Sequence, residues 1–186
     1  MAESPAWVIA GRMRVSSEIH WRWPRSAAAF GIGVAILALL SSGAARAAAD
    51  CALSTTGVVF GNYDPLVTAN TDSTGEVIVV CTHVSGGATQ VNYTVALSAG
   101  GSGNYAQRQM RAGTATLNYN LFDSAAFTRI WGNGTAGTAR VAGSMRVNPG
   151  ANSVLRASHP IYGRIPALQA VATGNYSDTI VVTLTF

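Results

Sequence analysis

The chain ends on the stretch Asp178-Thr-Ile-Val-Val-Thr-Leu-Thr-Phe186, in which the side chains alternate between two kinds. One face of an extended strand would carry the apolar residues Ile180, Val182, Leu184 and Phe186. The opposite face would carry three threonines and Val181. Alternation with a period of two residues is typical of a strand that buries one face. The sequence therefore predicts a C-terminal strand with an apolar face turned toward a core.

Three further segments upstream have the composition of strands. Residues 76–81 form an apolar run after a single glutamate, whereas residues 91–97 and 117–122 alternate. Turn-forming residues separate such segments, as at 62–65 and 148–150. Short strands spaced by turn signals are typical of β-sandwiches and barrels. We expect one all-β domain, an immunoglobulin-like sandwich of six or seven strands.

The first fifty residues have the three parts of a secretory signal peptide. A basic region ends at Arg25, an uncharged apolar run covers residues 27–40, and small residues follow through Ala49. Cleavage sites of the small-x-small type end at Ala47 and at Ala49. The apolar run has 14 residues, fewer than the roughly 20 that a membrane-spanning helix needs. We therefore expect a signal peptide over residues 1–49 and a mature domain over 50–186, with no membrane span after cleavage.

The net charge of +4 belongs mainly to this leader, which holds five of the twelve arginines. From Asp50 onward, seven arginines and six acidic residues leave a balance of +1, and lysine is absent from the whole chain. A nucleic-acid interface needs several cations gathered on one face. We therefore expect no nucleic-acid partner.

The two cysteines of the chain, Cys51 and Cys81, both follow the leader. An even number of cysteines in an exported chain indicates a disulfide. Closing a loop of 30 residues would stabilise the fold by roughly 3–4 kcal/mol on the chain-entropy model. The alternative is a metal site, but His83 and His159 do not have the spacing of tetrahedral ligands.

The mature segment contains no motif that points to catalysis. Its two histidines and six acidic residues are not arranged as G-x-S-x-G, H-E-x-x-H or a phosphate-binding loop. His159 precedes Pro160 in what we interpret as a loop. We expect no enzyme activity, no catalytic or metal-binding residues and no cofactor.

Aromatic residues beside glycines recur along the mature chain, as at Trp131-Gly132 and Tyr162-Gly163. Such rings fill core volume while the glycine lets the chain turn beside them. The same rings could form a stacking platform for a carbohydrate. Burial in the core is the commoner fate of such rings, and we prefer it here. The alternative function is that of a self-sufficient extracellular binding module, for example one that binds carbohydrate.

The order of motifs in the mature chain resembles the spore coat protein U family. After Cys51 the motifs run Phe60-Gly-Asn-Tyr-Asp-Pro65, Cys81, Arg108-Gln-Met110, Leu117-Asn-Tyr-Asn-Leu-Phe122, Trp131-Gly-Asn-Gly-Thr135, Tyr162-Gly-Arg-Ile-Pro166 and Gly174-Asn-Tyr-Ser-Asp178. The resemblance marks these core and turn positions: Phe60, Gly61, Tyr63, Pro65, Trp131, Gly132, Tyr162, Gly163, Gly174, Tyr176 and Asp178. No single motif is decisive, but the ordered set covers essentially the whole mature chain.

The resemblance implies a secreted bacterial surface protein, either a spore-coat component or a subunit of an archaic chaperone–usher pilus that acts in adhesion and biofilm formation. Such a subunit has an incomplete sandwich that lacks one strand. A periplasmic chaperone, and later a neighbouring pilus or coat subunit, supplies the missing strand, and an outer-membrane usher passes the subunit outward. The implied location is the cell surface, a pilus or the spore coat, reached through the periplasm.

The resemblance also gives the C-terminal strand a role, because strand addition places alternate side chains in pockets. We expect Ile180, Val182, Leu184 and Phe186 to form one wall of a strand-acceptor groove; the alternative is that they fill a complete core. A donor would need an alternating apolar arm before its first cysteine, but at most residues 48–50 remain there after cleavage. We therefore expect a strand acceptor without its own donor arm, such as a tip, a cap or a coat protein that does not polymerise in this way.

Overall fold

The computed structural model describes residues 6–8, 14–17, 48–150 and 153–186. The apolar run of the predicted leader and its first predicted cleavage site, which ends at Ala47, lie outside these residues. The second predicted site, which ends at Ala49, is described only at its last two residues. None of the described residues belongs to a helix with the length and hydropathy needed to cross a membrane.

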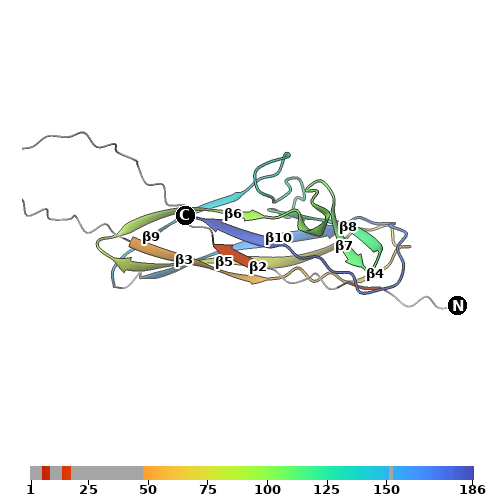
Figure 1. Ribbon diagram of the computed structural model, residues 1–186, viewed down its shortest axis with the longest axis horizontal. Helices are drawn as coiled ribbons and strands as arrows, with labels where there is room; N and C mark the ends of the chain where they lie inside the picture. Colours follow the sequence, from red (N-terminus) through yellow and green to blue (C-terminus); the bar gives the residue numbers. More distant parts are fainter. Residues whose placement is uncertain (1–5, 9–13, 18–47, 151–152) are drawn as a thin grey trace, which may run out of the picture.

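Two antiparallel-rich sheets make up the domain, and both run along its long axis (Figure 1). The larger sheet contains, in spatial order, β3 (Ala48–Thr56), β5 (Thr71–Ser85), β10 (Val154–Ile165), β8 (Ala115–Phe122) and β7 (Arg108–Ala112). The smaller sheet contains β2 (Arg14–Ser17), β11 (Val181–Thr185), β6 (Thr89–Leu97) and β9 (Val141–Val147). A short ribbon pairs β1 (Ala6–Val8) with β4 (Gly61–Tyr63), and the 3-10 turn η1 (Gly100–Ser102) follows β6.

The all-β sandwich with one disulfide is confirmed. Cys51 and Cys81 face each other in the register of β3 and β5, and their sulfurs are bonded. The strand count is higher than expected, because the described residues from Ala48 onward contain nine strands, β3 to β11, rather than six or seven. The predicted strands at 76–81, 91–97 and 117–122 correspond to β5, β6 and β8, and the C-terminal strand is shorter than predicted.

The interpretation of His159 as a loop residue is wrong. His159 lies inside β10, which pairs with β5 along twelve residues. Pro160 is tolerated there because β8 joins the other side of β10 only from Tyr162 onward. At Pro160 the strand is therefore an edge, which is where a residue without a backbone N–H is found in sheets.

The core lies between the two sheets and takes alternate residues from each. The inward rows include Val77 and Val79 of β5, Val95 and Leu97 of β6, and Leu117 of β8, all of them buried. The period-two pattern that marked residues 91–97 in the sequence is therefore the pattern of burial, and the apolar run of β5 also buries alternate residues.

Candidate functional site

The C-terminal strand β11 has a different kind of partner on each edge. On one edge it pairs antiparallel with β6, with Val182 opposite Leu97 and Leu184 opposite Val95. On the other edge it pairs in parallel with β2 over four residues, 14–17. Figure 1 shows the red strand β2 lying along the molecule near the blue C-terminal strand. Both edges of β11 are thus hydrogen-bonded, one by the domain and one by the segment before the predicted cleavage sites.

The predicted groove residues fall into two groups. Ile180, Val182 and Leu184 are buried and belong to the core cluster. Phe186 follows the end of β11 and is 44% exposed. The alternation therefore turns three of the four side chains inward, and the last one lies at the surface. Their use as the wall of an acceptor groove stays a prediction.

The residues just before Cys51 are already committed to the larger sheet. Ala49 and Asp50 pair with His83 and Thr82 of β5, and β3 continues from there through Thr56. These residues belong to the edge strand of the larger sheet, and serving as a separate donor arm would require them to leave their ladder with β5. Residues 48–50 therefore do not form a free arm in this structure.

Residue Ser98, directly after β6, ties the domain to the first residue of β11. Its backbone N–H donates to the Val181 carbonyl at 2.9 Å, and the Val181 N–H donates to the Ser98 hydroxyl at 2.9 Å. In a regular antiparallel pair the second bond would go to the backbone carbonyl. Here the side-chain oxygen of Ser98 takes the place of its carbonyl in the ladder.

The Ser98 carbonyl is occupied by the guanidinium of Arg108, a residue of β7 that is 0% exposed. Nε and Nη2 of Arg108 donate to this carbonyl at 3.1 and 2.8 Å. Nη2 also donates to the Trp131 carbonyl at 2.7 Å, and Nη1 donates to Oδ1 of Asn120 at 2.7 Å. Four hydrogen bonds thus compensate a buried charge, which is costly to bury without partners.

Burial lowers the pKa of Arg108, and the tyrosines Tyr119 and Tyr105 and the carboxylate of Asp178 act in the opposite direction. Tyr119 donates its hydroxyl to Oδ2 of Asp178 at 2.7 Å. Burial is the main cause that raises the pKa of Tyr119, and Asp178 raises it further. The carboxylate that raises the pKa of the buried cation is thus the one that accepts a hydrogen bond from Tyr119.

Asp178 makes a second tie between the turn after β6 and the approach to β11. Its Oδ1 accepts from the backbone N–H of Gly101 at 2.8 Å and from that of Thr179 at 2.8 Å. Gly100 lies against the same carboxylate, so that a Cβ on Gly100 would come within 2.0 Å of Oδ2. Gly100 also has a φ of +71°, which favours glycine. The turn and Asp178 therefore fit each other only with glycine at this position.

Comparison with known proteins accounts for this arrangement of motifs. The profile of the Spore Coat Protein U domain matches residues 36–183, most of the chain. This chain belongs to the Spore Coat Protein U domain family. Protein U of Myxococcus xanthus is 32% identical over 134 residues, which cover 68% of this chain and 70% of that protein.

Among solved structures, a similar chain comes from the crystal structure of the CsuC-CsuE chaperone-tip adhesion subunit pre-assembly complex from archaic chaperone-usher Csu pili of Acinetobacter baumannii. The TM-score is 0.47 at 22% sequence identity, and the match covers 75% of this chain. This chain spans 40% of the length of that one.

The Spore Coat Protein U motif positions lie mainly inside the sandwich. The buried aromatic residues among them are Phe60, Tyr63, Trp131 and Tyr176. Trp131 is fully buried, and its Nε1 donates to the Val95 carbonyl at 3.0 Å. A sugar cannot stack on a ring that has no exposed face, so the burial of Trp131 excludes this residue from a carbohydrate-stacking site.

The motif glycines are close-approach or turn positions. A Cβ on Gly163 would come within 2.7 Å of Phe60 and Val58, and a Cβ on Gly132 would come within 2.4 Å of Thr138. A Cβ on Gly174 would lie 3.1 Å from the Ala112 side chain, which is a tight contact, whereas Gly61 has a φ of +74°. Pro65 lies in the turn between β4 and β5, and is half-buried. These positions explain the motifs by packing rather than by ligand binding.

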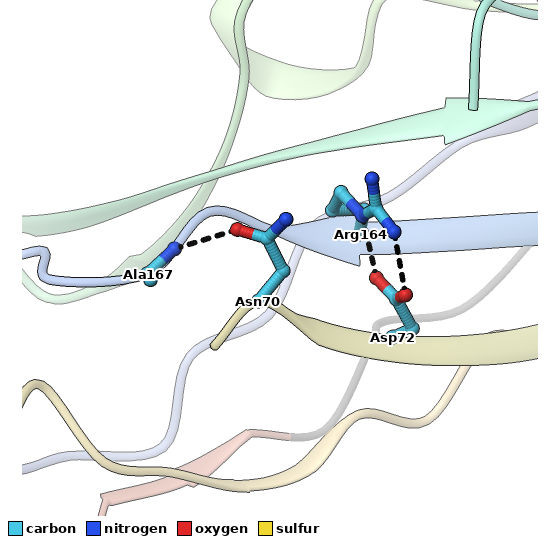
Figure 2. A network of polar contacts seen from close by, with 4 residues as sticks. All are labelled: Asn70, Asp72, Arg164 and Ala167. Carbon is cyan, nitrogen blue, oxygen red and sulfur yellow. Dashed lines mark hydrogen bonds and ion pairs between the residues drawn. The ribbon is translucent and has the colours of Figure 1, made fainter. Parts of the chain in front are cut away.

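The Tyr162 motif continues into a surface network that joins the ends of β10 and β5 (Figure 2). Nε and Nη2 of Arg164 donate to the two carboxylate oxygens of Asp72, both at 2.7 Å. The hydrogen bonds to Asp72 are the main cause that raises the pKa of Arg164. Oδ1 of Asn70 accepts from the backbone N–H of Ala167 at 3.1 Å. This network fixes the exit of β10, so that its role is structural.

The histidines of the mature segment lie apart. The ring of His159 is 2.9 Å from the Tyr93 hydroxyl, across the two sheets, and His83 contacts the Gly87 carbonyl. Burial lowers the pKa of His159. Among residues 48–150 and 153–186, no group of three metal-ligating side chains comes together.

Ser98 and Arg108 were not among the site residues predicted from the sequence. The motif Arg108-Gln-Met110 was part of the resemblance to the family. An arginine next to apolar residues usually indicates the end of a strand rather than a buried position within one. The available signal was the spacing of Arg108 and Met110, which places a charged and an apolar side chain on one face.

Proposed function

We propose that this chain is an exported structural subunit of the bacterial surface that accepts a strand from another protein along β11. Its role is in a spore coat or an adhesive pilus rather than in catalysis. The family membership supports a coat or surface role. The pairing of β11 supports the assembly mode, and is the observation that carries the proposal.

The strand next to β11 comes from the predicted leader. Val182 and Leu184 point into the core, while the outer edge of β11 pairs with residues 14–17. Removal of the leader would take β2 away and leave a row of unpaired N–H and C=O groups beside an apolar strand. Such an edge promotes aggregation unless another strand covers it. A strand from another protein would restore the hydrogen bonds.

The partners follow from this vacancy and from the family resemblance. A periplasmic chaperone would supply the strand first, a neighbouring pilus or coat subunit would replace it, and an outer-membrane usher would pass the subunit to the surface. Because residues 48–50 are held in the ladder with β5, the chain would receive a strand without giving one. A tip, a cap or a coat protein that does not polymerise has this property.

The test is to produce the chain from Asp50 onward, with the disulfide formed, in the presence and absence of a peptide of residues 12–19. The peptide contains β2, and a scrambled peptide of the same composition is the control. We expect aggregation or loose packing of the domain alone and a soluble, cooperatively unfolding complex with the peptide. A soluble, cooperatively folding monomer in the absence of any peptide would contradict the proposal and favour a self-sufficient binding module.

A further inference from the structure

We propose that Arg108 and Ser98 act together as positioning residues for the acceptor strand β11. The inference rests on the proposed function of β11, and assigns to two side chains the role of fixing the position of that strand against β6. The hydrogen bonds of Arg108 go to Ser98, Asn120 and Trp131, which lie outside β11. Arg108 acts through Ser98, which bonds to the first residue of the strand, Val181.

The first step is the exchange of acceptors at Ser98. In the register of β6 and β11, Ser98 stands opposite Val181, one pair beyond Leu97 and Val182. The Ser98 carbonyl would be the regular acceptor for the Val181 N–H. It accepts Nε and Nη2 of Arg108 instead, and the hydroxyl of Ser98 accepts from Val181 at 2.9 Å. A hydroxyl is therefore required at this position for as long as the guanidinium holds the carbonyl.

The second step is the rigidity of the guanidinium. Arg108 is fully buried, and it also donates to the Trp131 carbonyl and to Asn120. Trp131 in turn is anchored to β6 by its indole N–H and to β8 by its backbone N–H, which donates to the Leu121 carbonyl at 2.9 Å. A planar fork with several fixed acceptors has one orientation. Ser98 is therefore held from the interior of both sheets.

The third step is the consequence for strand acceptance. A strand added beside β11 must find its N–H and C=O groups in register, and a shift of one residue would reverse the two faces. The hydrogen bonds at Val181 fix where β11 begins, and therefore fix the register of Val182 and Leu184 against Leu97 and Val95 of β6. The pair Arg108–Ser98 would thus preorganise the edge that the donor strand meets.

The experiment uses the full chain, in which β2 already occupies the outer edge of β11. Amide hydrogen exchange is measured by mass spectrometry on wild type, Ser98→Ala, Ser98→Thr and Arg108→Lys. The matched controls are Ser102→Ala, whose hydroxyl bonds only within its own turn, and Arg111→Lys, an exposed arginine of the same strand β7.

We expect Ser98→Ala to raise the exchange rate of residues 181–185 and of residues 14–17 about tenfold, because it removes one hydrogen bond and orphans an N–H. Arg108→Lys should also raise the exchange rate, because the compact ammonium lacks the planar fork that reaches the separate acceptors on Ser98, Trp131 and Asn120. Ser98→Thr keeps the hydroxyl and should restore slow exchange, while the ladder of β5 and β10 and both controls should match wild type.

Unchanged exchange at residues 181–185 in Ser98→Ala would overturn the proposal. Failure of Ser98→Thr to restore slow exchange would do the same. A uniform rise in all strands would assign the pair to general stability instead. The measurement needs no external partner, so it is independent of the peptide test above. If the domain accepts no donor strand, the proposed function is wrong, but exchange in the variants can still show that Arg108 and Ser98 position β11.

Discussion

The disulfide between β3 and β5 gives the most quantitative test of the fold. Replacing both cysteines in Cys51→Ala/Cys81→Ala opens a loop of 30 residues in the unfolded chain. On the chain-entropy model this costs about 3.5 kcal/mol of the free energy of unfolding at 25 °C. Both side chains are buried, so the variant also loses the packing of two sulfur atoms.

The assay is urea unfolding of the full chain, followed by tryptophan fluorescence and circular dichroism. With a denaturant slope of about 2 kcal/mol per M, the midpoint should fall by about 1.5–2 M. Wild type under a reducing agent keeps the sulfur atoms and loses only the cross-link, so its difference from the alanine variant isolates the packing contribution. A midpoint that stays within the error of oxidised wild type in both samples would refute the reasoning.

Three further predictions concern particular side chains, each measured by thermal or urea unfolding. Gly103→Ala places a Cβ at positive φ in open space and should lower the free energy of unfolding by about 1 kcal/mol. In Gly100→Ala the Cβ also meets the Asp178 carboxylate, so the loss should be about 1–3 kcal/mol larger. Equal losses in the two variants would contradict the packing of this turn. Leu184→Ala should cost about 2–5 kcal/mol because the side chain is buried, and Phe186→Ala should stay within about 0.5 kcal/mol; comparable losses would contradict the inward and outward placement. Because burial lowers the pKa of His159, the unfolded chain binds the proton more readily, so stability should fall as the pH drops through the unfolded value near 6.5; His159→Gln should weaken this dependence, and an unchanged pH profile would argue against it.

The strands that could be predicted from the sequence are those with a clear apolar face. Residues 76–81, 91–97 and 117–122 alternate or run apolar, and all three lie in the sandwich core. The strand β10 was missed because its first seven residues alternate between exposed and half-buried positions, and the seventh of them is Pro160. Its place in the sheet depends on β5, which is about eighty residues away in sequence, and local patterns carry no information on such pairing.

The C-terminal strand and its contacts were predicted only in part. The alternation at the C-terminus located the inward row, but it did not indicate where the strand ends, so Phe186 was placed with the buried side chains. The hydrogen bonds at Ser98 and Asp178 join residues some eighty positions apart, so local sequence patterns could not predict them. They depend on the geometry of the turn after β6 and on the buried guanidinium of Arg108. Sequence patterns favour a surface position for arginine, and only the structure supplies the three acceptors that stabilise Arg108 in the interior.

The measurement that tests the central claim most directly is amide hydrogen exchange of residues 181–185 in the processed chain, with and without the peptide of residues 12–19. If the outer edge of β11 is vacant after processing, these amides should exchange quickly in the loosely packed domain alone. They should gain more protection than the amides of β5 and β10 when the peptide binds. Protection that is already complete in the absence of the peptide would show a finished sheet at this edge, and would contradict the assignment of β11 as a strand acceptor.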